Sequence, residues 1–301
     1  MFDRLSLPED LVDCRGFLIA RRGFVVSPEA IDEAAAVTVP EARQALAGTP
    51  LAADVAEPLS DPTYVHLFQG DGVRDAVERV LLAVRLPSVL FEELLAARRV
   101  GSPLHRHAFA TAAVAVRMLL SALGEAKGLS DLGAAALLHD VGMRHLPSRL
   151  LRNEERLSRA DGERIAAHPL LGGYHLATVL GRHPAVVAAR SHHWRCGQGY
   201  PVLAKGPPRS IEVIAVASAF AALTQPRSYR SGAYDARGGC DVLVEEAGRN
   251  RADGSSVKLL VHALRGGRGD PRNIRFGHER DGHAPERNGY QQPSAPQRNM
   301  L

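Results

Sequence analysis

The chain has 301 residues, of which 45% are hydrophobic but only 5% aromatic, a balance that favours a core of packed helices with a small accessory domain over a β-sandwich or barrel. The formal net charge is +4 at pH 7, but much of the excess lies in an arginine-bearing C-terminal tail, so it does not indicate a nucleic-acid-binding surface. Isolated cysteines without CxxC spacing (Cys14, Cys196 and Cys240), the lack of an apolar run of membrane-spanning length and the lack of a signal peptide predict a cytoplasmic protein without disulfides or membrane segments.

Residues 1–46 predict a small α+β module. Two β-prone runs flank Arg21-Arg22-Gly23, where glycine suits the positive φ of a tight hairpin. Ser27 and Pro28 then predict a helix start, with Ser27 as the N-cap and Pro28 as the first helical residue. A module of this size is typically regulatory, so we expect any protein partner to bind through it.

Residues 47–63 are rich in proline and poor in large apolar residues, which predicts a linker. Apolar residues return with helical spacing from 73 to 97, where Pro87 separates two helices because proline removes a backbone donor and clashes with the preceding turn. We expect a helical domain over residues 64–264. From residue 265 to 301 the composition offers too little apolar surface to offset the entropy of ordering, which predicts disorder.

Successive predicted helices begin or end at a histidine. The gaps between these histidines are about one helical hairpin long, so a bundle could direct them to one interior point. The residues concerned are His107 at a helix start, His139-Asp140 at a helix end, His168 in a helix opened by a Ser158/Asp161 capping box, and His192-His193 after a helix that begins at Pro184.

These side chains indicate a metal centre. Imidazole nitrogen and carboxylate oxygen are the ligand types that suit divalent ions such as Zn, Mn and Fe, and an aspartate can bridge two of them. The adjacent pair His192 and His193 would be costly to bury together unless a cation held both rings neutral. Taken singly, a His-Asp pair is more often a surface dyad, so the interpretation depends on the whole set.

This ordered set of motifs resembles the HD-GYP branch of the HD-domain phosphohydrolases. The resemblance covers roughly residues 100–264, about half of the chain. It implies an HD-type helical bundle with a two- or three-metal centre that hydrolyses the bacterial second messenger cyclic di-GMP. The matching segments are His139-Asp140, His168-Pro169, His192-His193, Gly197-Gln198-Gly199-Tyr200-Pro201 and Arg227-Ser228-Tyr229-Arg230.

The resemblance implies two divalent transition-metal ions (Fe, Mn or Zn) as cofactors, with Asp140 bridging them and His139 and Asp140 as the catalytic pair. His105 is an alternative to His107, which fits better by its place ahead of the helix. The first ion would use His107, His139 and Asp140, and the second would use Asp140, His168, His192 and His193. We expect His145, His175, His183, His262, His278 and His283 to be ordinary surface or core residues.

The resemblance also implies a substrate-binding set. Gly199, Tyr200 and Pro201 form the family's loop, although by themselves they could be an ordinary turn. Arg227, Tyr229 and Arg230 would contact phosphate and base, for which guanidinium forks and an aromatic face are suited.

Some positions depart from the family pattern. Ser218 stands where the family commonly has an aspartate that completes the first metal site, and a neutral hydroxyl is a poor ligand. Met143 replaces the lysine after His-Asp-x-Gly, and the neighbouring Arg144 could point elsewhere. Pro103 replaces an acidic residue that supports a third metal in some members, so we do not expect a third ion.

The leading hypothesis is therefore a weak metal-dependent phosphodiesterase acting on cyclic di-GMP or a related phosphoester. Two ions would lower the pKa of a shared water so that it attacks phosphorus. Hydrolysis of a different phosphoester is a second possibility, because the superfamily is chemically broad. A catalytically degenerate module that binds a nucleotide or a protein partner is the alternative, and Ser218 and Met143 favour it.

Overall fold

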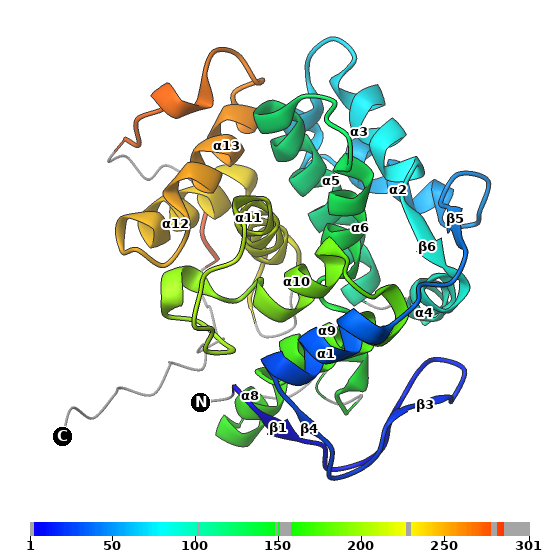
Figure 1. Ribbon diagram of the computed structural model, residues 1–301. Coiled ribbons are helices and arrows are strands. Elements are labelled where there is room, and N and C mark those ends of the chain that lie inside the picture. Colours follow the sequence, from blue (N-terminus) through cyan, green and yellow to red (C-terminus); the bar gives the residue numbers. More distant parts are fainter. Residues whose placement is uncertain are drawn as a thin grey trace, which may run out of the picture.

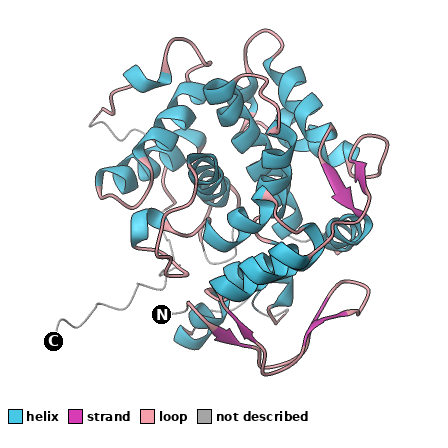
Figure 2. Cartoon of the chain, viewed as in Figure 1, coloured by secondary structure: helices cyan, strands magenta, loops and turns pink. Residues whose placement is uncertain are grey.

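The computed structural model describes residues 3–100, 103–147, 150, 158–226, 230–277 and 282–285. Helices dominate these residues, and the strands among them form short antiparallel pairs toward one side of the molecule (Figure 2). The mainly α-helical bundle predicted from the sequence is confirmed. The strands are β1 (Leu5–Ser6), β2 (Leu11–Val12), β3 (Leu18–Ala20), β4 (Val25–Val26), β5 (Arg43–Ala45) and β6 (Arg85–Pro87).

The helices follow in chain order (Figure 1). They are α1 (Pro28–Val37), α2 (Ala52–Ser60), α3 (Val73–Leu82), α4 (Ser88–Arg99), α5 (Pro103–Leu123), α6 (Leu129–Leu138), α8 (Arg159–Ile165), α9 (His168–Leu180), α10 (Pro184–Ser191), α11 (Arg209–Thr224), α12 (Ala236–Gly248) and α13 (Gly254–Leu264). Shorter 3-10 turns are η1 (Val65–Phe68), η2 (Val141–His145), η3 (Arg195–Gly197) and η4 (Pro271–Asn273).

A long hairpin arm, residues 5–26, opens the chain. β1 pairs with β4 and β2 pairs with β3, so the chain reverses between β2 and β3. At that reversal the N–H of Asp13 donates to the carbonyl of Phe17 at 3.0 Å. The predicted hairpin at Arg21-Arg22-Gly23 is therefore wrong. These residues make a turn inside the returning strand, because the partners of β3 and β4 lie earlier in the chain.

The N-terminal segment packs directly on the helical domain. Ser27 caps α1 as predicted, accepting the N–H of Ala30 at 3.2 Å, and Pro28 is its first residue. α1 lies along α9 (Figure 1), and its buried Ile31 lies against Gly173 of α9. β5 pairs with β6, which precedes α4 at Pro87. The segment is thus joined to the later helices by a helix contact and a strand pair.

The segment predicted to be a linker, residues 47–63, contains helix α2. Leu51, Val55 and Leu59 are fully buried, and their spacing of four residues places them on one helical face. α2 packs against α3 and α5. This stretch therefore belongs to the core, and the linker prediction missed an apolar stripe hidden among small residues and prolines.

Helix α5 runs through the bundle and packs against α6 and α11 (Figure 1). By length and composition it could cross a membrane, which corrects the expectation that no apolar run reaches that length. However, 72% of its apolar window is buried inside the protein. Its alanine-rich faces let neighbouring helices approach closely, as expected for a central core helix.

The C-terminal part differs from prediction in two ways. The sequence did not reveal α12, whose buried Cys240, Leu243 and Val244 lie where α12 packs against α11 and α13. Beyond α13, Ile274 and Phe276 pack against the core, so the packed chain extends past the predicted boundary at 264. The remainder of the predicted tail, residues 278–281 and 286–301, lies outside the described residues.

Candidate metal centre

All of the predicted metal ligands lie at or near helix ends. Side chains at helix ends can converge because the backbone there no longer directs neighbours onto divergent faces. The ends meet at one pocket with a volume of about 430 Å³. His107 lies near the start of α5, His139 and Asp140 follow α6, His168 begins α9, and His192 and His193 follow α10.

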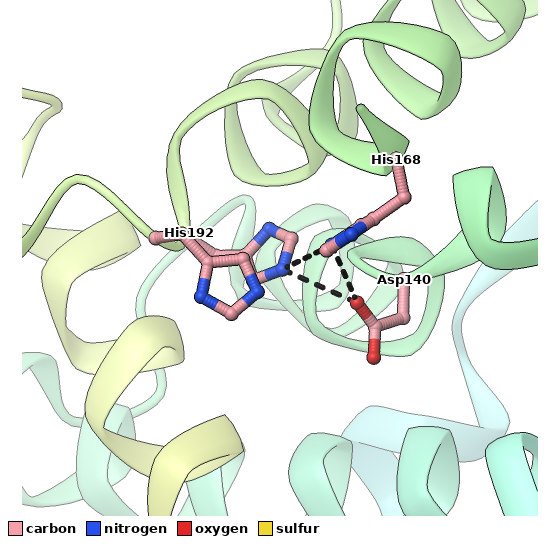
Figure 3. Close-up of side chains that lie close together, drawn as sticks. Asp140, His168 and His192 are labelled. Carbon is pink, nitrogen blue, oxygen red and sulfur yellow. Dashed lines mark hydrogen bonds and ion pairs between the residues drawn. The ribbon is translucent and has the colours of Figure 1, made fainter. Parts of the chain in front are cut away.

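Asp140 lies at the middle of this group. Its Oδ1 is 3.2 Å from Nε2 of His168 and 3.2 Å from Nε2 of His192 (Figure 3). Its Oδ2 is 3.6 Å from Nε2 of His107 and 3.5 Å from Nε2 of His139. Each carboxylate oxygen therefore faces a different pair of imidazoles, which is the arrangement that a bridging carboxylate requires.

Backbone carbonyls fix the orientation of the histidine rings. A carbonyl can only accept, so the ring nitrogen bonded to it carries the hydrogen, and the other nitrogen of a neutral ring presents a lone pair. We assign the Nε2 lone pairs of three rings to the pocket side on this ground. The bonds run from Nδ1 of His139 to Ala136 O (2.7 Å), from Nδ1 of His168 to Ile165 O (2.7 Å) and from Nδ1 of His192 to Ala188 O (3.0 Å).

The separation of two of these nitrogens fits a bound cation. Nε2 of His168 and Nε2 of His192 are 3.2 Å apart, and in this assignment neither carries a hydrogen. Two lone pairs facing each other repel unless a cation lies between them. Ligands of a tetrahedral ion with metal–nitrogen bonds of about 2.0–2.1 Å are roughly 3.3 Å apart, so the observed spacing matches such an ion.

The ligand atoms form two groups that share one residue. The four-residue group consists of Asp140, His168, His192 and His193. The three-residue group consists of His107, His139 and Asp140. Within each group, the ligand atoms all lie within 4.8 Å of one another. Nitrogen and carboxylate donors at this density fit divalent transition ions, in keeping with the metal-binding prediction.

Burial and charge set the protonation of these side chains. Burial lowers the pKa of His139 to about 4, despite the nearby Asp140 carboxylate. Burial, with His192 and His168 adding to it, also lowers the pKa of His193 well below its usual range. For Asp140, burial alone would raise the pKa, but the surrounding imidazoles of His139, His168 and His192 hold it well below the ordinary value. Neutral imidazoles around an ionised carboxylate are the states that metal ligands need.

Ser218 faces the three-residue ligand group, as its alignment with the family predicts. Its Oγ lies 3.1 Å from Nε2 of His139 and 3.3 Å from Nε2 of His107. α11 carries this residue, which lines the pocket. The serine thus stands where a carboxylate would complete the group, and it offers a neutral oxygen instead.

Gly142 makes the close packing of η2 on α9 possible. A Cβ at Gly142 would lie 2.0 Å from the carbonyl oxygen of His168 and 2.5 Å from the backbone nitrogen of Gly172. Only glycine lets η2 approach α9 this closely. Because Asp140 is the N-cap of η2 and His168 begins α9, this contact fixes the distance between the two ligands.

The three loop residues predicted to bind substrate, Gly199, Tyr200 and Pro201, differ in whether they line the pocket. Tyr200 lines the pocket and stacks on the ring of His193, with centroids 4.6 Å apart and planes at 21°. Gly199 supports the loop: its N–H donates to Trp194 O at 3.0 Å, and a Cβ there would lie 1.5 Å from His193 O. Pro201 is buried. Substrate contact by Gly199 and Pro201 remains a prediction.

Arg230 lines the pocket, but its guanidinium is bound to the protein. It donates to the carbonyls of Leu223 at 2.8 Å, of Ala222 at 2.5 Å and of Gln225 at 2.8 Å, and so caps the end of α11. Phosphate binding by Arg230 would require these bonds to break. Arg227 and Tyr229 lie outside the described residues.

The pocket includes residues that the sequence reading did not assign to the site. Trp194 and Arg195 directly follow the paired histidines, and Arg251 and Glu212 come from later segments. Arg251 pairs with Glu246 at 3.1 Å. Trp194 and Arg195 could have been noticed from their position after His192-His193, whereas the other two reach the pocket only through the packing of α11 and the turn before α13.

The other histidines that the structure describes lie outside the two ligand groups, as expected of surface or core residues. His105 lies 3.3 Å from Asp54 on α2, which resolves the choice in favour of His107 at the centre. His145 and His175 are hydrogen-bonded to each other at 3.1 Å. His183 accepts the N–H of Ala185 at 3.1 Å as a helix cap, and His262 donates to Gly269 O at 2.9 Å. His278 lies outside the described residues, and the backbone N–H of His283 donates to Asp235 at 3.1 Å.

Comparison with known proteins identifies the family. Residues 90–256, more than half of the chain, match the HD domain family. The chain belongs to this family. HD domains bind divalent metals, and the two ligand groups described above are where this chain could hold them.

Curated relatives match over part of their length. The chain is 30% identical over 128 residues to 3'3'-cGAMP-specific phosphodiesterase 1 of Vibrio cholerae, covering 42% of this chain and 30% of that protein. It is 27% identical over 156 residues to the cyclic di-GMP phosphodiesterase PdeB of Borreliella burgdorferi, covering 49% of this chain and 40% of that protein. The matches thus span less than half of either relative.

A solved structure is also similar. It is the HD domain of the L. monocytogenes phosphodiesterase PgpH in complex with cyclic-di-AMP, with a TM-score of 0.42 and 16% sequence identity. The match covers 57% of this chain and 94% of that one.

Proposed function

We propose that this HD-domain protein is a metal-dependent phosphodiesterase of the HD-GYP branch that hydrolyses a cyclic dinucleotide such as cyclic di-GMP. The observation that carries the proposal is the position of Asp140, whose oxygens face two separate groups of imidazoles at the edge of a 430 Å³ pocket. That volume falls in the range of small-molecule sites, about 300–1,000 Å³. The names of the two curated relatives support a cyclic dinucleotide as the substrate.

The chain's own residues suit this reaction. Bound divalent ions supply an activated water and neutralise phosphate charge. Asp140 would serve both ions, while His168, His192 and His193 would hold one ion and His107 and His139 would hold the other. The carbonyl bonds to Nδ1 keep the rings of His139, His168 and His192 aimed at the pocket without reorganisation.

The pocket walls would position the substrate. Tyr200, held against His193, offers an aromatic face beside the ligands, and Trp194 offers another. Arg195 and Arg251 line the same pocket, Arg251 beside its partner Glu246, and their guanidinium groups would attract phosphate. These residues take over the role first predicted for Arg230, whose fork is bound to backbone carbonyls.

A second candidate function is a catalytically silent module that binds a cyclic dinucleotide or a protein partner. Ser218 favours it, because one ligand group contains a neutral hydroxyl where a carboxylate is expected. Met143 favours it also, because an apolar side chain lines the pocket where a cation would assist phosphate binding.

The deciding experiment incubates the purified protein with Mn or Fe(II) and, separately, with cyclic di-GMP, 3'3'-cGAMP and cyclic di-AMP, with products resolved by chromatography. Metal-dependent cleavage of one of them supports the enzyme. Binding of the metal and a cyclic dinucleotide without cleavage supports the silent module. A simple phosphodiester such as bis(p-nitrophenyl) phosphate serves as the test for a broader phosphoesterase.

A further inference from the structure

Arg144 lies near the end of η2, the 3-10 turn that follows Asp140 and is called the metal loop below, and its side chain turns away from the pocket. Its Nη1 is 2.5 Å from Oε1 of Glu93 on α4 and donates to the carbonyl of Val12 in the hairpin arm at 3.4 Å. Segments that are far apart in the sequence thus meet at one guanidinium.

Glu93 joins the arm to this contact. The side chain is only 6% exposed, and the same Oε1 accepts the backbone N–H of Cys14 at 2.9 Å. Burial raises the pKa of Glu93, and the charge of Arg144 and the bonds from Cys14 oppose that effect. One buried carboxylate oxygen therefore holds both the arm and the metal loop.

The other side of η2 is fixed to α9. Gly142 contacts the backbone of α9 with no space for a Cβ, and Nε2 of His145 lies 3.1 Å from Nδ1 of His175. The N–H of Met143 donates to the carbonyl of Asp140 at 2.9 Å, which makes Asp140 part of the same turn. Any shift of η2 therefore moves the residue that both ligand groups share.

We propose that Arg144 and Glu93 are positioning residues that couple the N-terminal hairpin arm to the metal centre, so that docking of the arm and binding of metal stabilise each other. The coupling follows because Glu93, one of the α4 residues that hold the arm, also holds through Arg144 the turn that carries Asp140. Arg15 of the arm is bound to α4 as well, through Glu92. Such coupling is reciprocal by thermodynamic necessity. This inference rests on the metal centre of the proposed function and not on its substrate.

The first test measures Co(II) binding and the visible absorption of the Co(II)-loaded protein. Loss of a residue that orients a ligand typically weakens metal binding by about 10–100-fold, so Arg144→Met should weaken Co(II) binding by at least about tenfold and alter the spectrum. Arg144→Lys should restore part of the affinity, because lysine keeps the positive charge but lacks the several fixed N–H donors of a guanidinium. Glu93→Gln should resemble Arg144→Met. Arg79→Met, which removes an exposed ion pair with Glu125, is the control and should change neither quantity.

The second test needs no variant, so it stands even if these substitutions prevent folding. Hydrogen exchange of the wild-type protein is compared with and without Co(II), and peptides that contain Cys14 should exchange more slowly when the metal is bound. Unchanged exchange of the arm, or a folded Arg144→Met protein with wild-type affinity and spectrum, overturns the coupling. Failure of the wild-type protein to bind Co(II) at all would instead refute the metal centre itself.

Discussion

The hydroxyl of Ser218 lies 3.1 Å from Nε2 of His139, inside the ligand group that has only three metal-binding residues. The other group has four. Among the residues that the structure describes, the shared Asp140 is the only carboxylate in either group. An ion beside Ser218 would therefore receive less compensating charge than is usual for such a centre. The two metal positions should differ in affinity.

We predict that Ser218→Asp raises both metal content and phosphodiesterase turnover, because it adds a negative ligand next to His107 and His139. Metal per chain and hydrolysis rate are measured at equal Mn concentration for both proteins. Ser218→Ala serves as the control, since it removes the hydroxyl without adding charge and should not raise either quantity. If Ser218→Asp folds normally and changes neither, then position 218 does not limit the centre.

The double substitution His192→Ala with His193→Ala should abolish binding at the four-residue group, because these rings supply most of its nitrogen ligands. Hydrolysis should be lost with the metal. Metal analysis after gel filtration provides the measurement. His66→Ala is the matched control, since His66 is an exposed histidine outside the pocket. Wild-type metal content in the double variant would refute the assignment of these ligands.

Gly142→Ala should destabilise the fold by several kcal/mol, on the order of 3 or more, since the added Cβ would overlap backbone atoms that cannot move independently. Urea unfolding monitored by circular dichroism gives the change in free energy. Gly248→Ala at the end of α12, where a Cβ meets no atom within 4 Å, is the control and should stay within about 1 kcal/mol of wild type. A stable Gly142→Ala protein would show that η2 and α9 are not in this close contact.

Acid should destabilise the metal-free protein. Burial lowers the pKa of His139 to about 4 and that of His175 to about 4, from an ordinary value of 6.5. Between those values the unfolded chain binds more protons than the folded one, so stability is fully present above about pH 6.5 and falls as the pH drops toward 4.

His175→Gln should reduce this loss by up to about 2 kcal/mol between pH 7.5 and pH 5.0, at 1.36 kcal/mol per pKa unit. Urea unfolding in EDTA at the two pH values measures it. Equal stability of the wild-type protein at both would contradict the pKa shifts.

The convergence of the candidate metal ligands could be predicted because each belongs to a short motif at a helix end. His139-Asp140 and His192-His193 are adjacent in the sequence, and their distances to one another depend little on details of the fold. The position of Ser218 at the pocket could also be predicted, because the resemblance to the HD-GYP branch implies a ligand position there and residue 218 lies inside one uninterrupted helix, α11.

Other features depend on tertiary contacts that no local pattern specifies. Arg230 looks like a free phosphate ligand in the sequence, yet the end of α11 provides carbonyl acceptors for it. The sequence did not predict α2 because Pro58, which is unfavourable in a helix, lies inside it. It did not predict α12 because Gly238 and Gly239 lie near its start. The strand pairs of the arm depend on which earlier segment each strand meets.

The most direct test of the central claim compares wild-type protein with Asp140→Asn, because Asp140 is the residue shared by both ligand groups. Metal per chain and cleavage of cyclic di-GMP, 3'3'-cGAMP and cyclic di-AMP are measured together in the presence of Mn. We predict that the wild-type protein binds metal and cleaves at least one of these nucleotides, and that Asp140→Asn, while folded, loses most of both. Wild-type protein that is loaded with metal but cleaves none of them, or Asp140→Asn protein that cleaves as well as wild type, would contradict the claim.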